Sequence, residues 1–129
     1  MRRKFDNKGL LMELRSEEMP NGVKLVTLAG RFDIAGTQEI DQRFTALTAT
    51  SKALIAVDVS AVSFLASIGI RTLVSSARAL ANRGGAMALI GPQPLVEQTL
   101  LAAGIDSIIP IYPNLDEAGR GLQASATAH

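Results

Sequence analysis

The sequence predicts a single α/β domain, built on a mixed but mostly parallel sheet of about five strands with about four helices. Two observations support this prediction: a hairpin signal near the N-terminus, and an alternation of apolar runs with helical stripes after it. The alternation implies right-handed crossovers between parallel strands, whereas the hairpin adds one antiparallel strand. The 129 residues suit one domain, and a hydrophobic content of 47% can fill its core.

The first elements form the antiparallel hairpin. Leu10, Met12 and Leu14 alternate with polar residues, which is typical of a strand with one buried face. Asn21-Gly22 favours a tight turn, because both residue types tolerate positive φ. The next expected segments are a strand over 23–29 that ends at Gly30 and a loop over 31–33.

A helix, a buried strand and a second helix follow. Ile40, Phe44 and Leu47 lie on one face of the first helix. The strand over 53–57 is almost entirely apolar, as expected where both faces are covered, and a short loop begins after Asp58. The second helix opens at Ser67, and its apolar stripe comprises Ile70, Leu73, Val74, Ala77, Leu80 and Ala81.

The last third of the chain continues the alternation. Arg83-Gly84-Gly85 stops the second helix, because glycine readily adopts the left-handed conformation that ends helices. Pro110 interrupts the final strand and places it at an edge of the sheet. The remaining expected elements are a strand over 86–90, a helix over 95–103, the edge strand over 108–112 and a helix over 115–122. Residues 1–7 and 123–129 are expected to be flexible tails.

Composition excludes several classes of function. The formal charge of +1, from 13 basic and 12 acidic residues, argues against nucleic acid as a partner. The chain has no cysteine and its single histidine is His129, so we expect no metal site. No phosphate-binding glycine motif is present, and we expect no cofactor. No apolar segment approaches the length of a membrane span, so we expect a cytoplasmic protein without membrane insertion.

Two carboxylates are candidates for acid–base chemistry. Asp33 and Asp58 both follow predicted strands, which would bring them to one edge of the sheet. The alternative is that each carboxylate orders the loop beside it, and this is the role we expect for Asp58. Since no nucleophile or cofactor motif accompanies the pair, we expect that the protein is not an enzyme.

Ser67 has two possible roles at the start of its helix. The first backbone N–H groups of a helix have no internal partners, so a hydroxyl there can cap the helix. The same N–H groups and the positive end of the helix dipole can also tolerate a phosphate. The residue types alone leave both interpretations open.

The segment around Ser67 resembles the signature of the STAS domain family. That signature comprises a strand that ends in Asp-hydrophobic-Ser, then a Phe, then Asp-Ser-Ser-Gly. The corresponding segments here are, in the same order, Asp58-Val59-Ser60, Phe64 and Ala66-Ser67-Ile68-Gly69. Leu28-Ala29-Gly30-Arg31-Phe32-Asp33, Arg83-Gly84-Gly85 and Leu100-Leu101-Ala102-Ala103-Gly104-Ile105 resemble further family segments. The resemblance implies one STAS domain over about residues 8–117.

The resemblance also implies a function. The best-known members are bacterial anti-sigma factor antagonists, which bind an anti-sigma factor that is also a serine kinase. In that pattern Ser67 is the phosphorylated residue, and phosphorylation releases the partner; a phosphatase is a further expected partner. Ala66 and Ile68 stand where the family has Asp and Ser. The expected partner-binding residues are Asp33, Ala66, Ser67, Ile68, Gly69, Arg71, Ser75 and Arg78.

Two other roles are consistent with the same resemblance. One is a STAS subunit of a membrane transporter complex, which binds an ATPase subunit without phosphorylation; the missing Asp at position 66 favours it. The other is a STAS domain that binds a nucleotide or another small molecule.

Overall fold

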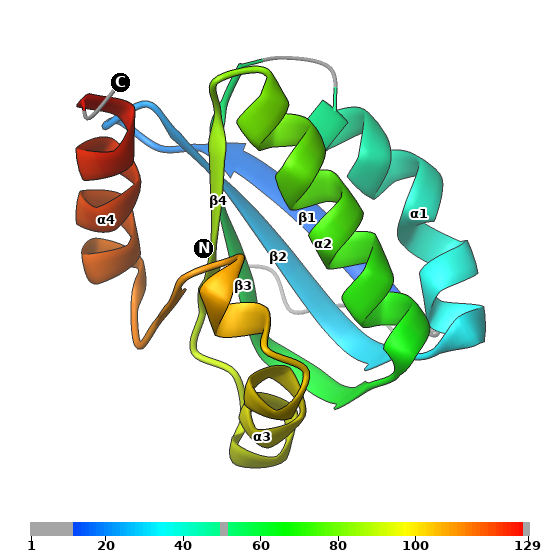
Figure 1. Cartoon of the computed structure of the whole chain (residues 1–129). Helices are drawn as coiled ribbons and strands as arrows, with labels where there is room; N and C mark the ends of the chain where they lie inside the picture. The colour runs from blue at the N-terminus through cyan, green and yellow to red at the C-terminus, as the bar shows by residue number, and fades with distance from the viewer. Residues whose placement is uncertain (1–11, 50–51, 128–129) are drawn as a thin grey trace, which may run out of the picture.

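A computed structural model of the chain describes residues 12–49 and 52–127. These residues form one five-stranded sheet with the strand order β1-β2-β3-β4-β5 (Figure 1). The first two strands are antiparallel and all other neighbours are parallel, which confirms the predicted fold class. The strands are β1 (Met12–Glu18), β2 (Val23–Phe32), β3 (Leu54–Leu65), β4 (Ala86–Ile90) and β5 (Ile111–Tyr112).

Helices cover both faces of the sheet (Figure 1). Helices α1 (Ile34–Ala49) and α2 (Ser67–Asn82) lie side by side on one face, and α4 (Leu115–Thr127) covers the other. Helix α3 (Pro94–Ala102) and the short 3-10 helix η1 (Ile105–Ser107) lie at the end of the sheet. None of the helices in the described ranges is long and apolar enough to cross a membrane.

The core consists of two clusters of apolar side chains, one on each face of the sheet. The larger cluster lies beneath α1, α2 and α3 and includes Phe32 and Phe44, both fully buried. The smaller cluster lies beneath α4 and comprises Val23, Leu25, Ala56, Ala88, Ile90, Ala118 and Leu122. The parallel strands therefore contribute to both clusters, which explains why β4 is apolar throughout.

The N-terminal hairpin is confirmed. Gly22 has a φ of +84°, and the two strands pair in register up to Glu18 and Lys24. Met12 and Leu14 are buried, as their alternation predicted. The strand reaches Glu18 rather than ending at Leu14, because pairing continues to the turn; Leu10 lies outside the described residues.

Strands β2 and β3 are longer than predicted, and two predicted loops are wrong. Gly30 does not end β2, which runs on to Phe32. The loop expected after Asp58 is part of β3, which continues to Leu65. The physical reason is cross-strand pairing, because each extension supplies the hydrogen-bonding partner of the other.

Two bulges in β3 explain why the sequence pattern did not predict this extension of the strands. Between the pairs Thr27–Asp58 and Ala29–Ala61, β3 contains one more residue than β2, and the same occurs between Gly30–Val62 and Arg31–Phe64. Each bulge breaks the alternation of side chains, so Val59, Val62 and Leu65 are buried at intervals of three. The exposed position of Phe64 follows from the second bulge.

The helix ends follow the expected glycine signals. At the end of α2, Gly84 has a φ of +83°, and the Gly85 N–H donates to the Leu80 carbonyl at 2.8 Å. This is the Schellman arrangement, which satisfies the last carbonyls of a helix. Helix α3 begins at Pro94, and Gly104 beyond it has a φ of +73°.

The C-terminal elements differ in length from the prediction. Strand β5 has only two residues, because the N–H groups of Ile108 and Ile109 donate back to the Ile105 carbonyl and Pro110 has no N–H to offer a ladder. Helix α4 continues to Thr127, so the described part of the expected tail over 123–129 is helical.

Candidate functional site

The amino ends of α1 and α2 meet at the carboxyl edge of the parallel strands (Figure 1). Phe32 ends β2 and pairs with Leu65, which ends β3. The Ala66 N–H then donates to the Phe32 carbonyl at 3.0 Å. This bond joins the segment between β2 and α1 to the segment between β3 and α2. The starts of the two helices, at Asp33 and Ser67, therefore lie next to each other.

Ser67 is exposed at the first position of α2. The capping position is Ala66, which has an extended backbone (φ −97°, ψ 168°), and no side chain caps the helix. The predicted capping role of Ser67 is therefore wrong: the bond from Ala66 to Phe32 fixes the helix start one residue earlier than a serine cap requires. Within the described chain, the Ser67 hydroxyl has no hydrogen-bond partner.

Gly69 packs against the protein's own core. A Cβ atom on Gly69 would lie 2.8 Å from two carbons of the Phe32 ring and 2.9 Å from the Phe32 carbonyl oxygen. Gly69 is buried, so its expected place on the partner-binding surface is wrong. The missing side chain of Gly69 lets Phe32 approach the helix backbone closely.

The other predicted residues of α2 gather on one exposed face. Ser67, Arg71, Ser75 and Arg78 follow the helical repeat, and all four are exposed. Ala66 and Ile68 are half-buried beside the first turn. The exposed face thus combines one hydroxyl at its amino end with two guanidinium groups further along.

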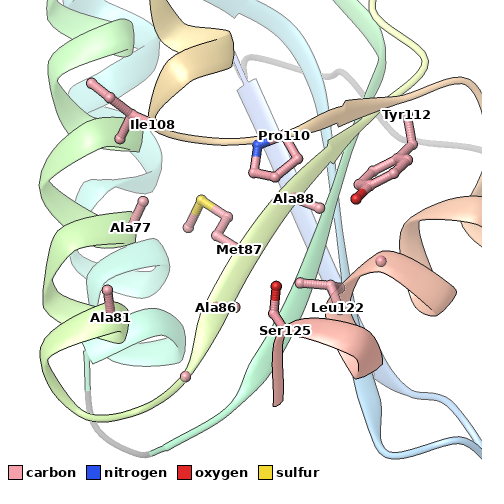
Figure 2. A pocket seen from close by; sticks show the side chains of 12 residues that line it. Ala77, Ala81, Ala86, Met87, Ala88, Ile108, Pro110, Tyr112, Leu122 and Ser125 are labelled. Carbon is pink, nitrogen blue, oxygen red and sulfur yellow. The ribbon is translucent and has the colours of Figure 1, made fainter. Parts of the chain in front are cut away.

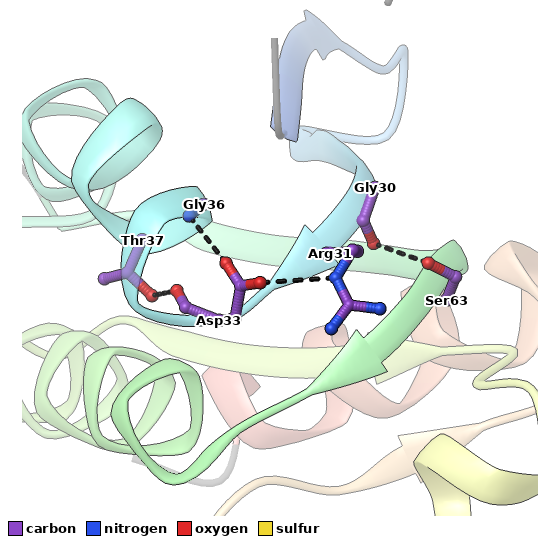
Figure 3. A network of polar contacts seen from close by, with 6 residues as sticks. All are labelled: Gly30, Arg31, Asp33, Gly36, Thr37 and Ser63. Carbon is purple, nitrogen blue, oxygen red and sulfur yellow. Dashed lines mark hydrogen bonds and ion pairs between the residues drawn. The ribbon is translucent and has the colours of Figure 1, made fainter.

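Asp33 is the capping residue of α1 (Figure 3). Its Oδ1 accepts the Gly36 N–H at 2.8 Å, while its backbone carbonyl accepts the Thr37 hydroxyl at 2.7 Å. Its Oδ2 accepts the Arg31 Nε–H at 3.3 Å. The Gly36 amide, with a further contribution from Arg31, lowers the pKa of Asp33 below the ordinary 3.8.

The structure adds three residues that are not among the expected partner-binding residues. The Arg31 guanidinium lies 4.5 Å from the centre of the Phe64 ring, a cation–π contact. The Phe64 side chain is 41% exposed and Ile34, the first residue of α1, is 63% exposed. Ile34 was detectable in principle, because it lies off the helical stripe formed by Ile40, Phe44 and Leu47.

Asp58 lies within β3 rather than at the carboxyl edge. Its Oδ1 accepts both the N–H and the hydroxyl of Ser60, at 2.9 and 2.7 Å. The Ser60 carbonyl in turn accepts the Gln93 side-chain amide at 2.9 Å, which links the bulge to the start of α3. Asp58 thus orders the chain around the first bulge.

The proposed acid–base pair of carboxylates is therefore wrong. Asp58 pairs with Thr27, which lies six residues before Asp33 along the chain. At about 3.3 Å per residue, this separates the two carboxylates by roughly 20 Å. Across the residues that the structure describes, no group of three or more acidic or histidine side chains is placed to hold a metal ion.

Sequence comparison identifies relatives of this chain. The family model for the STAS domain matches residues 16–118. A protein of Mycobacterium tuberculosis named as an anti-anti-sigma factor is 31% identical over 78 residues, which are 60% of this chain and 53% of that protein. The chain therefore aligns with about half the length of that relative.

Solved structures show the same fold. The crystal structure of an anti-sigma factor antagonist from Mycobacterium paratuberculosis superposes with a TM-score of 0.78 and 26% identity, covering 87% of this chain and 94% of that one. The antagonist SpoIIAA in its unphosphorylated form superposes with a TM-score of 0.71 and 18% identity, covering 87% of this chain and 97% of that one. SpoIIAA from Bacillus in its phosphorylated form superposes with a TM-score of 0.60 and 18% identity, covering 82% of this chain and 96% of that one. Since the family model matches most of the chain and the fold agrees, the protein belongs to the STAS domain family.

Proposed function

We propose that this protein is an anti-sigma factor antagonist that binds an anti-sigma factor with serine-kinase activity. The exposed, unpartnered hydroxyl of Ser67 at the amino end of α2 is the observation that carries the proposal. The names of the relatives from the two mycobacteria, and the two forms in which SpoIIAA was solved, support it.

In this proposal the partner binds the exposed face of α2 and the adjoining helix start. The residues involved are Asp33, Ala66, Ser67, Ile68, Arg71, Ser75 and Arg78. Ile34 and Phe64 add exposed apolar area beside them, which suits the apolar centre of a protein interface. Arg31 contributes a cation that is held in place by Asp33 and by the Phe64 ring.

Phosphorylation of Ser67 acts as the release step. The kinase transfers the γ-phosphoryl group of ATP to the Ser67 Oγ, which loses its proton, and ADP leaves. The phosphate adds about −1.5 to −2 charges at neutral pH. The amino end of α2 tolerates this charge, so the fold is retained. In a packed interface the same charge is desolvated beside the Asp33 carboxylate, so the complex dissociates.

The test uses an anti-sigma factor with serine-kinase activity from the same organism as the candidate partner. With ATP, we expect phosphate on Ser67 alone, located by mass spectrometry. Ser67→Ala should bind the kinase in the presence of ATP, whereas Ser67→Asp should remain folded but bind at least about tenfold more weakly. Ser16→Asp, an exposed site on β1, supplies the same charge far from α2 and should bind normally. Wild-type affinity in Ser67→Asp would refute the release step.

A transporter role remains the second candidate, because one observation favours it. Ala66 and Ile68 replace the Asp and Ser that usually flank the phosphorylated residue in the family. In this role the same face binds an ATPase subunit of a membrane transporter complex and Ser67 is never modified. Absence of phosphate on Ser67, together with unchanged binding of such a subunit to Ser67→Asp, would select this role.

A further inference from the structure

The edge of β4 beside β5 is only partly covered. Strand β5 pairs with β4 at Leu89 and Ile90 alone. The Leu89 N–H donates to the Pro110 carbonyl at 2.9 Å, whereas the Ala86 N–H faces the other way and donates to Ala53 at 3.0 Å. Because N–H groups alternate along a strand, Met87 directs its N–H and C=O toward the side of β5. The described chain places no strand there.

The unpaired groups of Met87 belong to a buried residue. Met87 is 4% exposed, and a buried backbone N–H without a partner is costly. The chain before Pro110 cannot serve as the partner, because η1 turns it away and the Ile109 N–H donates to Ile105 instead. The pairing with β5 therefore leaves the first three residues of β4 without a partner on this side, and among them only Met87 directs its backbone groups there.

A groove of about 270 Å³ runs along this open edge (Figure 2). Ala77 and Ala81 of α2 form one wall, and Gly121 and Ser125 of α4 form the other. Small side chains on both walls let another backbone approach β4 closely. No charged side chain lines the groove, and the rim at Ala81 and Ser125 is exposed.

We propose that this groove binds an extended, uncharged peptide segment of a partner protein, which pairs with the main chain of Met87. An extended strand supplies the backbone donor and acceptor that continue the ladder where β5 stops. The apolar lining selects small or apolar side chains on that strand. A second copy of this chain is a poor occupant, because its own β4 edge is recessed in the same way and its other edge strand, β1, carries charged side chains that do not suit the groove. The proposal does not rest on the role of Ser67, which lies at the other end of α2.

Amide hydrogen exchange measured by NMR tests the open edge. In the free protein, the Met87 amide should exchange at least about tenfold faster than the paired Leu89 amide. The probe is a short peptide of alternating Thr and Val with Lys at each end. We expect it to slow Met87 exchange, and to lose binding when its alternate backbone nitrogens are methylated.

Two variants locate the binding site. Ala81→Leu places a larger side chain in the groove at an exposed helical position and should weaken peptide binding at least about tenfold. Ala102→Leu, exposed at the end of α3, should bind normally. The proposal is overturned by equal binding of the methylated peptide, by no binding at millimolar peptide, or by equally slow exchange of Met87 and Leu89 in the free protein. Protection of Met87 that grows with protein concentration alone would identify a second copy as the occupant and overturn it too.

Discussion

Replacing Gly69 by alanine should destabilise the protein, although alanine is the better helix former. The added Cβ would lie 2.8–2.9 Å from three atoms of Phe32, whereas ordinary van der Waals contact begins at 3.4 Å. One of these atoms is a backbone oxygen, which cannot swing aside, so α2 and the end of β2 must separate. Overpacking of this kind costs about 1–3 kcal/mol, and the higher helix propensity of alanine offsets up to about 1 kcal/mol. After this offset we expect a net loss of up to about 2 kcal/mol, and a loss of about 1–3 kcal/mol relative to a glycine-to-alanine change without the clash.

Urea unfolding followed by far-UV circular dichroism measures this loss. Gly119→Ala is the matched control, since Gly119 also lies inside a helix. Its added Cβ would meet only the Asn21 side-chain amide, at 3.1 Å, and that side chain can move a few tenths of an ångström. The control should equal the wild type or exceed its free energy of unfolding by up to about 1 kcal/mol. If Gly69→Ala were as stable as Gly119→Ala, the packing argument would be refuted.

Two further predictions concern the carboxylates. Asp33→Ala should lower the urea midpoint at pH 7, because α1 loses its cap. Asp33→Asn should retain most of the stability that the cap provides, since its side-chain oxygen can still accept the Gly36 N–H. Because the pKa of Asp33 is lowered in the folded protein, its charged form stabilises the fold above pH 3.8. The wild type should therefore be more stable than Asp33→Asn at neutral pH, and this difference in stability should vanish as the pH falls through the lowered pKa. A difference in stability that does not change with pH would contradict this. Asp58→Ala should cost about 1 kcal/mol in urea unfolding by releasing Ser60, and Asp58→Asn less; equal stability of Asp58→Ala and wild type would contradict the role of this turn.

The elements that the sequence predicted well depend on local signals. The turn at Gly22 and the end of α2 at Gly84 each need a positive φ, and glycine supplies it within the segment itself. Strand β4 spans the predicted residues, because a short apolar run between a glycine stop and a proline-rich turn leaves little choice. The exposed face of α2 follows equally from the helical repeat.

The elements that the sequence predicted poorly depend on distant residues. The ends of β2 and β3 are set by pairing between Arg31 and Phe64, and the bulges that permit it carry no pattern of period two. The start of α2 is set by the bond from Ala66 to Phe32, which moved the cap away from Ser67. Gly69 matches a family position, but the need for glycine there comes from the Phe32 ring of β2, which leaves no room for a side chain.

The groove also gives the molecule a built-in spectroscopic reporter. Tyr112 is the only tyrosine and the chain has no tryptophan, so the intrinsic emission of this protein comes from one phenol. That ring lines the groove and packs against Gly121 of α4. Its fluorescence should therefore respond to events at the β4 edge and stay silent when Ser67, at the opposite end of α2, changes its chemistry. An unlabelled sample can thus report binding at the groove without interference from phosphorylation at the other end of the helix.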